Sequence, residues 1–147
     1  MKITEVKTNK KAYLSLLLLA DEQEDMVDRY LEKGTMFLLE DGGVKCECVV
    51  TDAGDGILEI KNLATEPAFQ GKGYARALIG FLEERYRGQY RILQVGTGDS
   101  PMTVPFYEKC GFTRSHIIPN FFTDHYDHPI IECGVQLKDM VYFRKNL

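Results

Sequence analysis

The fold of this chain is decided by the stretch Leu63-Ala64-Thr65-Glu66-Pro67-Ala68-Phe69-Gln70-Gly71-Lys72-Gly73-Tyr74-Ala75. It joins a strand-like run, Ile57–Thr65, to an amphipathic helix through a glycine-rich turn. Such a turn points several backbone N–H groups at one spot, at the positive end of the helix dipole, where a phosphate or pyrophosphate binds. The spacing is Gln-x-x-Gly-x-Ala, which is neither the dinucleotide pattern G-x-G-x-x-G nor the Walker pattern. Because Gly73 is followed by Tyr74, the turn does not suit a nucleoside triphosphate.

Length and composition limit the number of domains and the class of partner that the chain can have. The 147 residues match the size of one ordinary domain, so we expect a single domain over residues 1–147. A hydrophobic content of 44% supplies a real core. The formal net charge is −4 without a long basic run, which argues against a nucleic-acid partner and is compatible with a cationic amine substrate.

The apolar run Leu14–Ala20 resembles the centre of a signal peptide, but the acidic segment Asp21–Asp25 follows it without a cleavage site. The run is also far shorter than the roughly 20 residues that span a bilayer. We therefore expect a cytoplasmic protein that has no membrane partner. The four cysteines, with Cys46 and Cys48 on one face of a strand, are expected to be buried and reduced rather than metal-binding.

Hydrophobic periodicity predicts the order of the elements. In the first half we expect a strand at 1–7, a helix at 9–19, a second helix opened by a capping box of Asp21 and Glu24, and an antiparallel meander of strands at 35–40, 44–51 and 57–65. In the second half we expect a helix at 73–87, a strand at 91–95 parallel to the third meander strand, a short helix with Ser100 as N-cap and Pro101 after it, and strands at 112–118 and 138–144 joined by a long loop.

The predicted fold class is α/β (α+β): a mixed, mostly antiparallel central sheet of about six to seven strands with helices on both faces.

Two motifs carry a resemblance to a known family. Gln70-Gly71-Lys72-Gly73-Tyr74-Ala75, following Leu-Ala-Thr-Glu-Pro, resembles motif A of the GNAT family of acetyl-CoA-dependent N-acetyltransferases. Downstream, Pro105-Phe106-Tyr107-Glu108-Lys109-Cys110-Gly111-Phe112 is similar to the family's second signature, Phe-Tyr-Glu-Lys-x-Gly-Phe. Together the motifs span residues 57–112, in the right order and separation. The chain is thus identified as a small, single-domain, bacterial-type member with the acyl-CoA N-acyltransferase fold.

The resemblance implies acetyl-CoA as co-substrate and no metal. The pyrophosphate would lie on the turn, and the pantetheine arm would pair with the preceding strand, which splays from its parallel neighbour in this family. The implied cofactor-binding residues are Leu63, Ala64, Thr65, Gln70, Gly71, Lys72, Gly73, Tyr74, Ala75, Ser100 and Tyr107. Ser100 stands where many members have asparagine, so its role as helix cap or pantetheine contact is open. The alternative for the turn is an ordinary glycine turn before a packed helix.

Two residues are candidates for the chemistry. Tyr107 matches the tyrosine that protonates the departing thiolate in the family; otherwise it is a packed aromatic. Glu59 stands where histone-acetylating members carry a glutamate base; otherwise it is a solvent-facing strand residue. The reserves for the base are Glu66, Asp99 and Asp124, or an ordered-water relay.

The long loop between the last two strands is aromatic and acidic, and in this family it commonly walls the acceptor site. The candidate substrate-binding residues are Phe121, Phe122, Asp124, His125 and Tyr126. The alternatives are a packed surface loop, or a metal at His125 and His128, whose spacing is frequent by chance.

The sequence thus predicts an N-acetyltransferase that acts on a primary amine of a small molecule by direct attack in a ternary complex. A protein or peptide amine as acceptor and a non-catalytic acyl-CoA-binding sensor are the alternatives. The expected partners are a small-molecule amine and, as one option, a second copy in a homodimer.

Overall fold

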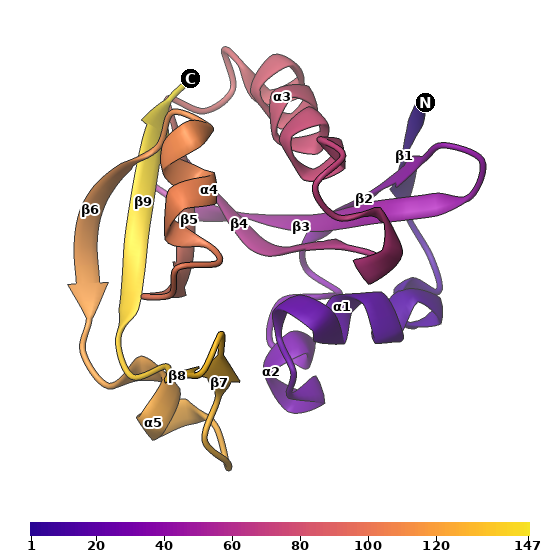
Figure 1. Ribbon diagram of the computed structural model, residues 1–147. Coiled ribbons are helices and arrows are strands. Elements are labelled where there is room, and N and C mark those ends of the chain that lie inside the picture. The colour runs from indigo at the N-terminus through magenta and orange to yellow at the C-terminus, as the bar shows by residue number, and fades with distance from the viewer.

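The computed structural model describes residues 1–147 and is built on a seven-stranded sheet in the order β1-β2-β3-β4-β5-β9-β6 (Figure 1). The strands are β1 (Lys2–Val6), β2 (Thr35–Glu40), β3 (Val44–Gly54), β4 (Ile57–Thr65), β5 (Ile92–Gly98), β6 (Thr113–Ile118) and β9 (Met140–Asn146). Every pairing is antiparallel except β4 with β5. The predicted fold class is confirmed, as are the meander and the parallel pairing.

Helices cover both faces of the sheet, and each face has its own core. The 3₁₀ turn η1 (Lys10–Tyr13), α1 (Leu14–Ala20) and α2 (Glu24–Asp28) lie on one face, where Leu17 and Val27 pack on Met36 and Val49. The other face carries α3 (Tyr74–Tyr86) and α4 (Val104–Lys109). There the stripe Leu78, Ile79 and Leu82 of α3 packs on β2–β5. None of the helices has the length and apolar character needed to cross a membrane.

The strands β4 and β5 pair only at their beginnings. Residues 57–60 are in register with residues 92–95, and no pairing continues beyond them. The second half of β4 pairs with β3 alone and leads through the 3₁₀ turn η2 (Pro67–Phe69) into α3. The two strands therefore diverge, which is the geometry expected for a strand whose free edge accepts a ligand.

Two predicted helix caps are wrong. The helix α2 begins at Glu24 after Gln23, and no side chain caps it. Asp21 instead accepts hydrogen bonds from two tyrosine hydroxyls, which compete with the local cap. The helix α4 begins at Val104 after Thr103, because residues 100–103 form a turn in which Ser100 Oγ accepts the Met102 N–H at 3.0 Å.

The expected featureless loop after β6 has structure of its own. It contains α5 (Phe121–His125) and a hairpin of β7 (Ile131–Glu132) and β8 (Val135–Gln136). The hairpin turn holds Cys133 and Gly134 at φ 50 and 75, the positive values that a tight two-residue turn requires. Elements of two to five residues are too short to show a periodicity, so the sequence pattern did not reveal them.

Candidate active site

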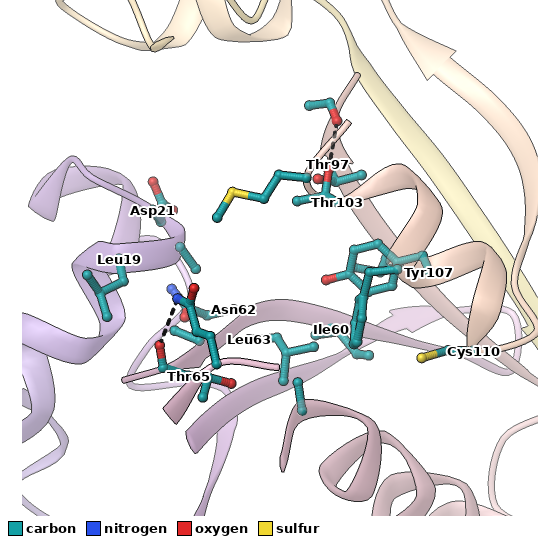
Figure 2. A pocket seen from close by; sticks show the side chains of 18 of the residues that line it. Leu19, Asp21, Ile60, Asn62, Leu63, Thr65, Thr97, Thr103, Tyr107 and Cys110 are labelled. Carbon is teal, nitrogen blue, oxygen red and sulfur yellow. Dashed lines mark hydrogen bonds between the residues drawn. The ribbon is translucent and has the colours of Figure 1, made fainter. Parts of the chain in front are cut away.

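A cleft of ≈ 540 Å³ opens where β4 and β5 diverge. One wall is formed by the end of α1 and the second half of β4, and the other by β5 and α4 (Figure 2). The glycine turn before α3 lies at one end, and residues of α5 and the β7–β8 segment lie at the other. The segments that carried both sequence motifs thus meet at one cavity.

The glycine turn offers a set of backbone N–H donors without partners in the chain. The backbone N–H groups of residues 71–76 donate no hydrogen bond within the chain, and no side chain caps α3. Gly71 and Gly73 have φ values of +78 and +86, which other residues adopt only with strain. A Cβ at either glycine would meet nothing within 4 Å, so the space beside the turn is open. The turn is therefore a ready anion site at the positive end of a 13-residue helix.

The side chains around this turn have separate roles. Gln70 Nε2 donates to the Thr65 carbonyl at 3.3 Å, and the Tyr74 hydroxyl donates to Asp41 at 2.8 Å, so both brace the turn. The Lys72 ammonium lies 5.5 Å from the Phe69 ring centroid and does not line the cleft. The backbone of the turn, rather than these side chains, is positioned to hold an anion.

The free edge of β4 faces the cleft. The Glu66 N–H donates to the Lys45 carbonyl, and Ala64 is in register with Glu47. Because hydrogen bonding alternates along an antiparallel pair, the N–H and C=O groups of Leu63 and Thr65 point away from β3. No strand occupies that side. The N–H and C=O of Leu63 and the N–H of Thr65 are therefore available to an extended ligand, while the Thr65 carbonyl accepts from Gln70 Nε2.

Tyr107 presents its hydroxyl to the cleft. Its ring packs against Phe106, Phe112 and Phe143, and the residue is only 7% exposed. The hydroxyl has no hydrogen-bond partner within the chain and points into the cavity (Figure 2). Burial raises the pKa of Tyr107, which keeps the hydroxyl protonated, as a proton donor requires.

Glu59, the candidate base, lies outside the cleft. Its Oε1 accepts from Gln94 Nε2 at 2.7 Å, and its Oε2 pairs with the Lys61 ammonium at 2.9 Å. Gln94 in turn accepts from Arg144 Nε at 2.8 Å, so the glutamate is tied into a network across β4, β5 and β9. It is not brought together with Tyr107. Ser100 is 2% exposed and is not part of the cleft lining either.

Only part of the predicted acceptor group reaches the cavity. Phe122 lines the cleft. Tyr126 does not line it, but its hydroxyl donates a hydrogen bond to Asp21, which does. Phe121, Asp124 and His125 do not line it. Phe121 packs against the small core of Phe122, Ile130 and Leu137, and the other two are exposed. The reserve carboxylates Glu66 and Asp99 also lie outside the lining.

The carboxylates that do line the cleft are Asp21 and Glu132, which sequence reasoning missed. The local pattern around Asp21 predicts a helix cap, whereas its tyrosine partners lie 9 and 105 residues away in the sequence. No local pattern could have signalled this arrangement. The structure contains no group of three or more His, Cys, Asp or Glu that could hold a metal ion.

Comparisons with known proteins agree with this architecture. Residues 32–114 match the family model of an acetyltransferase (GNAT) domain. The uncharacterised N-acetyltransferase YvbK of Bacillus subtilis (strain 168) is 35% identical over an alignment that covers 92% of this chain and 88% of that protein.

Solved structures are similar over nearly the whole chain. A GNAT family acetyltransferase from Elizabethkingia anophelis with acetyl-CoA bound has a TM-score of 0.93 at 30% identity, covering 99% of this chain and 97% of that one. An acetyltransferase from Bacillus subtilis in complex with CoA has a TM-score of 0.90 at 32% identity, covering 99% and 98%. An IAA acetyltransferase from Bacillus cereus ATCC 14579 has a TM-score of 0.90 at 33% identity, covering 99% and 100%. The chain therefore belongs to the GNAT family of acetyltransferases.

Proposed function

We propose that this protein transfers the acetyl group of acetyl-CoA to a primary amine of a small molecule, by direct attack in a ternary complex. The observation that carries this proposal is the meeting, in one cleft, of the free backbone N–H groups of residues 71–76, the free edge of β4 and the Tyr107 hydroxyl. The acetyl-CoA bound to the Elizabethkingia anophelis relative supports the choice of donor.

The cofactor would extend along the cleft and contact two segments of the chain, the glycine turn and β4. Its pyrophosphate would accept hydrogen bonds from the amides of residues 71–76, at the positive end of α3. Its pantetheine arm would pair with Leu63 and Thr65 as an extra strand on the free edge of β4. This orientation carries the thioester toward Tyr107, which lines the opposite wall.

The chemistry needs a neutral amine, a polarised carbonyl and a proton for sulfur. The amine nitrogen forms the C–N bond at the thioester carbonyl, whose oxygen is polarised by a backbone N–H of β4. Collapse of the tetrahedral intermediate breaks the C–S bond, and Tyr107 donates its proton to the departing thiolate. A proton from the attacking nitrogen returns to Tyr107 through water, so the tyrosine is regenerated.

The closed acceptor end of the cleft favours a small molecule over a protein. There the segment after α5 is bonded to the α1–α2 connection at three places. The Tyr126 hydroxyl donates to Asp21 at 2.6 Å, the Asp127 N–H donates to Gln23 Oε1 at 3.0 Å, and His128 Nε2 lies 3.0 Å from Glu22. These contacts join the α1–α2 connection to the segment after α5 at this end of the cleft and restrict the approach of a bulky chain.

Turnover with a panel of primary amines, measured as release of free CoA thiol, tests the function. The panel includes short peptides with free N-termini and lysines, so that a protein or peptide acceptor is also covered. Catalytic turnover with a small amine supports the proposal. Tight binding of acetyl-CoA in calorimetry without turnover across the panel would instead indicate an acyl-CoA-binding sensor.

A further inference from the structure

Asp21 is held in a defined position on the wall of the cleft. It follows the last residue of α1, across the cavity from Tyr107 (Figure 2). Its Oδ2 accepts from the Tyr30 hydroxyl at 2.9 Å and its Oδ1 from the Tyr126 hydroxyl at 2.6 Å. The two tyrosines come from different parts of the chain, one after α2 and one after α5. Two converging O–H donors fix the orientation of the carboxylate and favour its ionised form.

A second layer of hydrogen bonds fixes the direction of the Tyr30 proton. Asn62 Nδ2 donates to the Tyr30 oxygen and to the Leu17 carbonyl, each at 3.0 Å. Because the Tyr30 oxygen accepts this bond, its single proton is directed to Asp21. The carboxylate is therefore the acceptor at the end of a hydrogen-bond chain that begins inside the sheet.

Asp21 lacks a cationic partner. It forms no ion pair within 4.0 Å, and the nearby Lys61 ammonium is held by Glu59 at 2.9 Å. Burial raises the pKa of Asp21 despite the two tyrosine hydrogen bonds. A carboxylate that is partly desolvated, oriented and without a counter-ion is suited to bind a cation that enters the cleft.

We propose that Asp21 binds the acceptor as its ammonium ion and takes the proton that must leave before the nitrogen can attack. This assignment rests on the proposed acetyl transfer. The N–H bond of the ammonium breaks, Asp21 becomes a neutral acid, and the freed lone pair forms the C–N bond to the acetyl carbon. The proton passes from Asp21 to solvent when the product amide leaves, which restores the carboxylate.

The surroundings of Asp21 define the class of acceptor. Apolar side chains line much of this end of the cleft, namely Leu19, Met102, Phe122, Leu137 and Met140. Most of the polar side chains among them are engaged within the chain. Lys61 pairs with Glu59, Asn62 Nδ2 donates to Leu17 and Tyr30, and Thr103 Oγ1 donates to the Gly98 carbonyl. A carboxylate set among apolar side chains selects a primary ammonium group attached to an apolar body. A polyhydroxylated amine would find few free partners for its hydroxyl groups on these walls. The site thus fits an arylalkyl or alkyl amine better than an amino sugar.

The first test replaces the carboxylate and uses 2-phenylethylamine as the probe, with glucosamine as the polar comparison. Asp21→Asn is expected to raise the KM for 2-phenylethylamine about tenfold or more and to lower kcat, because an amide neither pairs with the ammonium nor takes its proton. Acetyl-CoA affinity, measured by calorimetry, stays unchanged. The control is Asp124→Asn, an exposed carboxylate outside the cleft, which leaves both constants unchanged.

The outcomes distinguish a failure of the role of Asp21 from a failure of the proposed acetyl transfer. Unchanged amine kinetics in Asp21→Asn would overturn the role of Asp21 while acetyl transfer stands. Turnover with glucosamine but not with 2-phenylethylamine would overturn the apolar class of acceptor. Acetyl-CoA binding without turnover on any amine would overturn the proposed function, and the role of Asp21 with it.

A second variant changes the pKa of Asp21 but keeps the carboxylate itself. Tyr126→Phe deletes one hydrogen bond to the carboxylate, and that bond lowers the pKa of Asp21. The variant should therefore move the acidic limb of kcat/KM to higher pH. Tyr90→Phe, which loses only a bond to Asp52, is the control. The ionisable groups that act on Asp21 are Tyr30, Lys61 and Tyr126, and Tyr126 in turn lies near Glu22 and Arg29. An acidic limb that does not move in Tyr126→Phe would overturn the role of Asp21 as proton acceptor.

Discussion

Glu47 is completely buried in β3, and neither carboxylate oxygen has a hydrogen-bond partner. Asn62 Oδ1 is also buried without a partner, and the two side chains lie diagonally across the β3–β4 pair. Burial raises the pKa of Glu47 well above its ordinary 4.5. A neutral Glu47 carries an O–H that can donate to Asn62 Oδ1, which would satisfy both residues and orient the amide that holds Tyr30.

This interpretation predicts the pH dependence of stability. Because the folded-state pKa of Glu47 is raised, its contribution is fully present below pH 4.5 and is lost as pH rises toward the folded-state value. Within that window the loss is about 1.4 kcal/mol per pH unit. Glu47→Gln cannot ionise, so its free energy of unfolding in urea should fall less steeply than that of the wild type between pH 4.5 and 7. Parallel profiles for the two proteins would show that Glu47 ionises normally.

Tyr107 can be tested by removing one atom. Tyr107→Phe keeps the ring contacts with Phe112 and Phe143 and loses only the hydroxyl. If this hydroxyl protonates the thiolate, kcat should fall roughly 10²-fold or more while acetyl-CoA affinity is unchanged. Steady-state kinetics and calorimetry measure the two quantities. A variant with wild-type turnover would reduce Tyr107 to a packing residue.

At the scale of elements, the unit β4–turn–α3 was predictable because its signals are local. The period of the apolar residues changes from strand to helix across a turn whose glycines need positive φ. The positions of Glu59 and Asp124 were not predictable in the same way. Glu59 is held by Gln94, which comes from β5, and Asp124 is turned outward by the short helix α5. The local sequence pattern shows neither the hydrogen bond between the two strands nor the helix.

Two glycine variants distinguish the effect of backbone strain from the effect of lost ligand binding at the turn before α3. Gly73→Val forces a branched side chain into φ +86 and into the open space beside the free amides. We expect it to weaken acetyl-CoA binding by about 2 kcal/mol or more in calorimetry, through lost hydrogen bonds and steric block. Gly88→Val carries the same strain at φ +88 after the end of α3, far from the cleft, and should bind normally. Equal affinity in both variants would contradict the assignment of the turn.

At the scale of the whole molecule, the sheet consists of two parts, β1–β4 and β5–β9–β6. They are paired only over residues 57–60 and 92–95. The contacts of Asp21, Glu22 and Gln23 with residues 126–128 join the same two parts at the acceptor end. The antiparallel meander and the parallel strand could be predicted from the sequence. The bridge could not, because it brings together polar residues more than a hundred positions apart that carry no shared pattern.

A ligand that fills the gap between the two parts should protect particular amides from hydrogen exchange. Acetyl-CoA is expected to slow exchange at Leu63 and Thr65, whose N–H groups face the gap, and at residues 71–76. Ala64 changes less, because its amide faces β3. At 100 times Kd the binding free energy available for such protection is about 2.7 kcal/mol.

Adenosine 3′,5′-bisphosphate, which lacks the pantetheine arm, provides the matched comparison. It should leave the exchange of Leu63 and Thr65 unchanged, because only the arm can pair with the free edge of β4. Exchange resolved by residue in NMR distinguishes the two ligands. If saturating acetyl-CoA leaves the Leu63 and Thr65 amides as fast as in the free protein, the cofactor does not lie along β4. The two parts of the sheet would then be held apart for another reason.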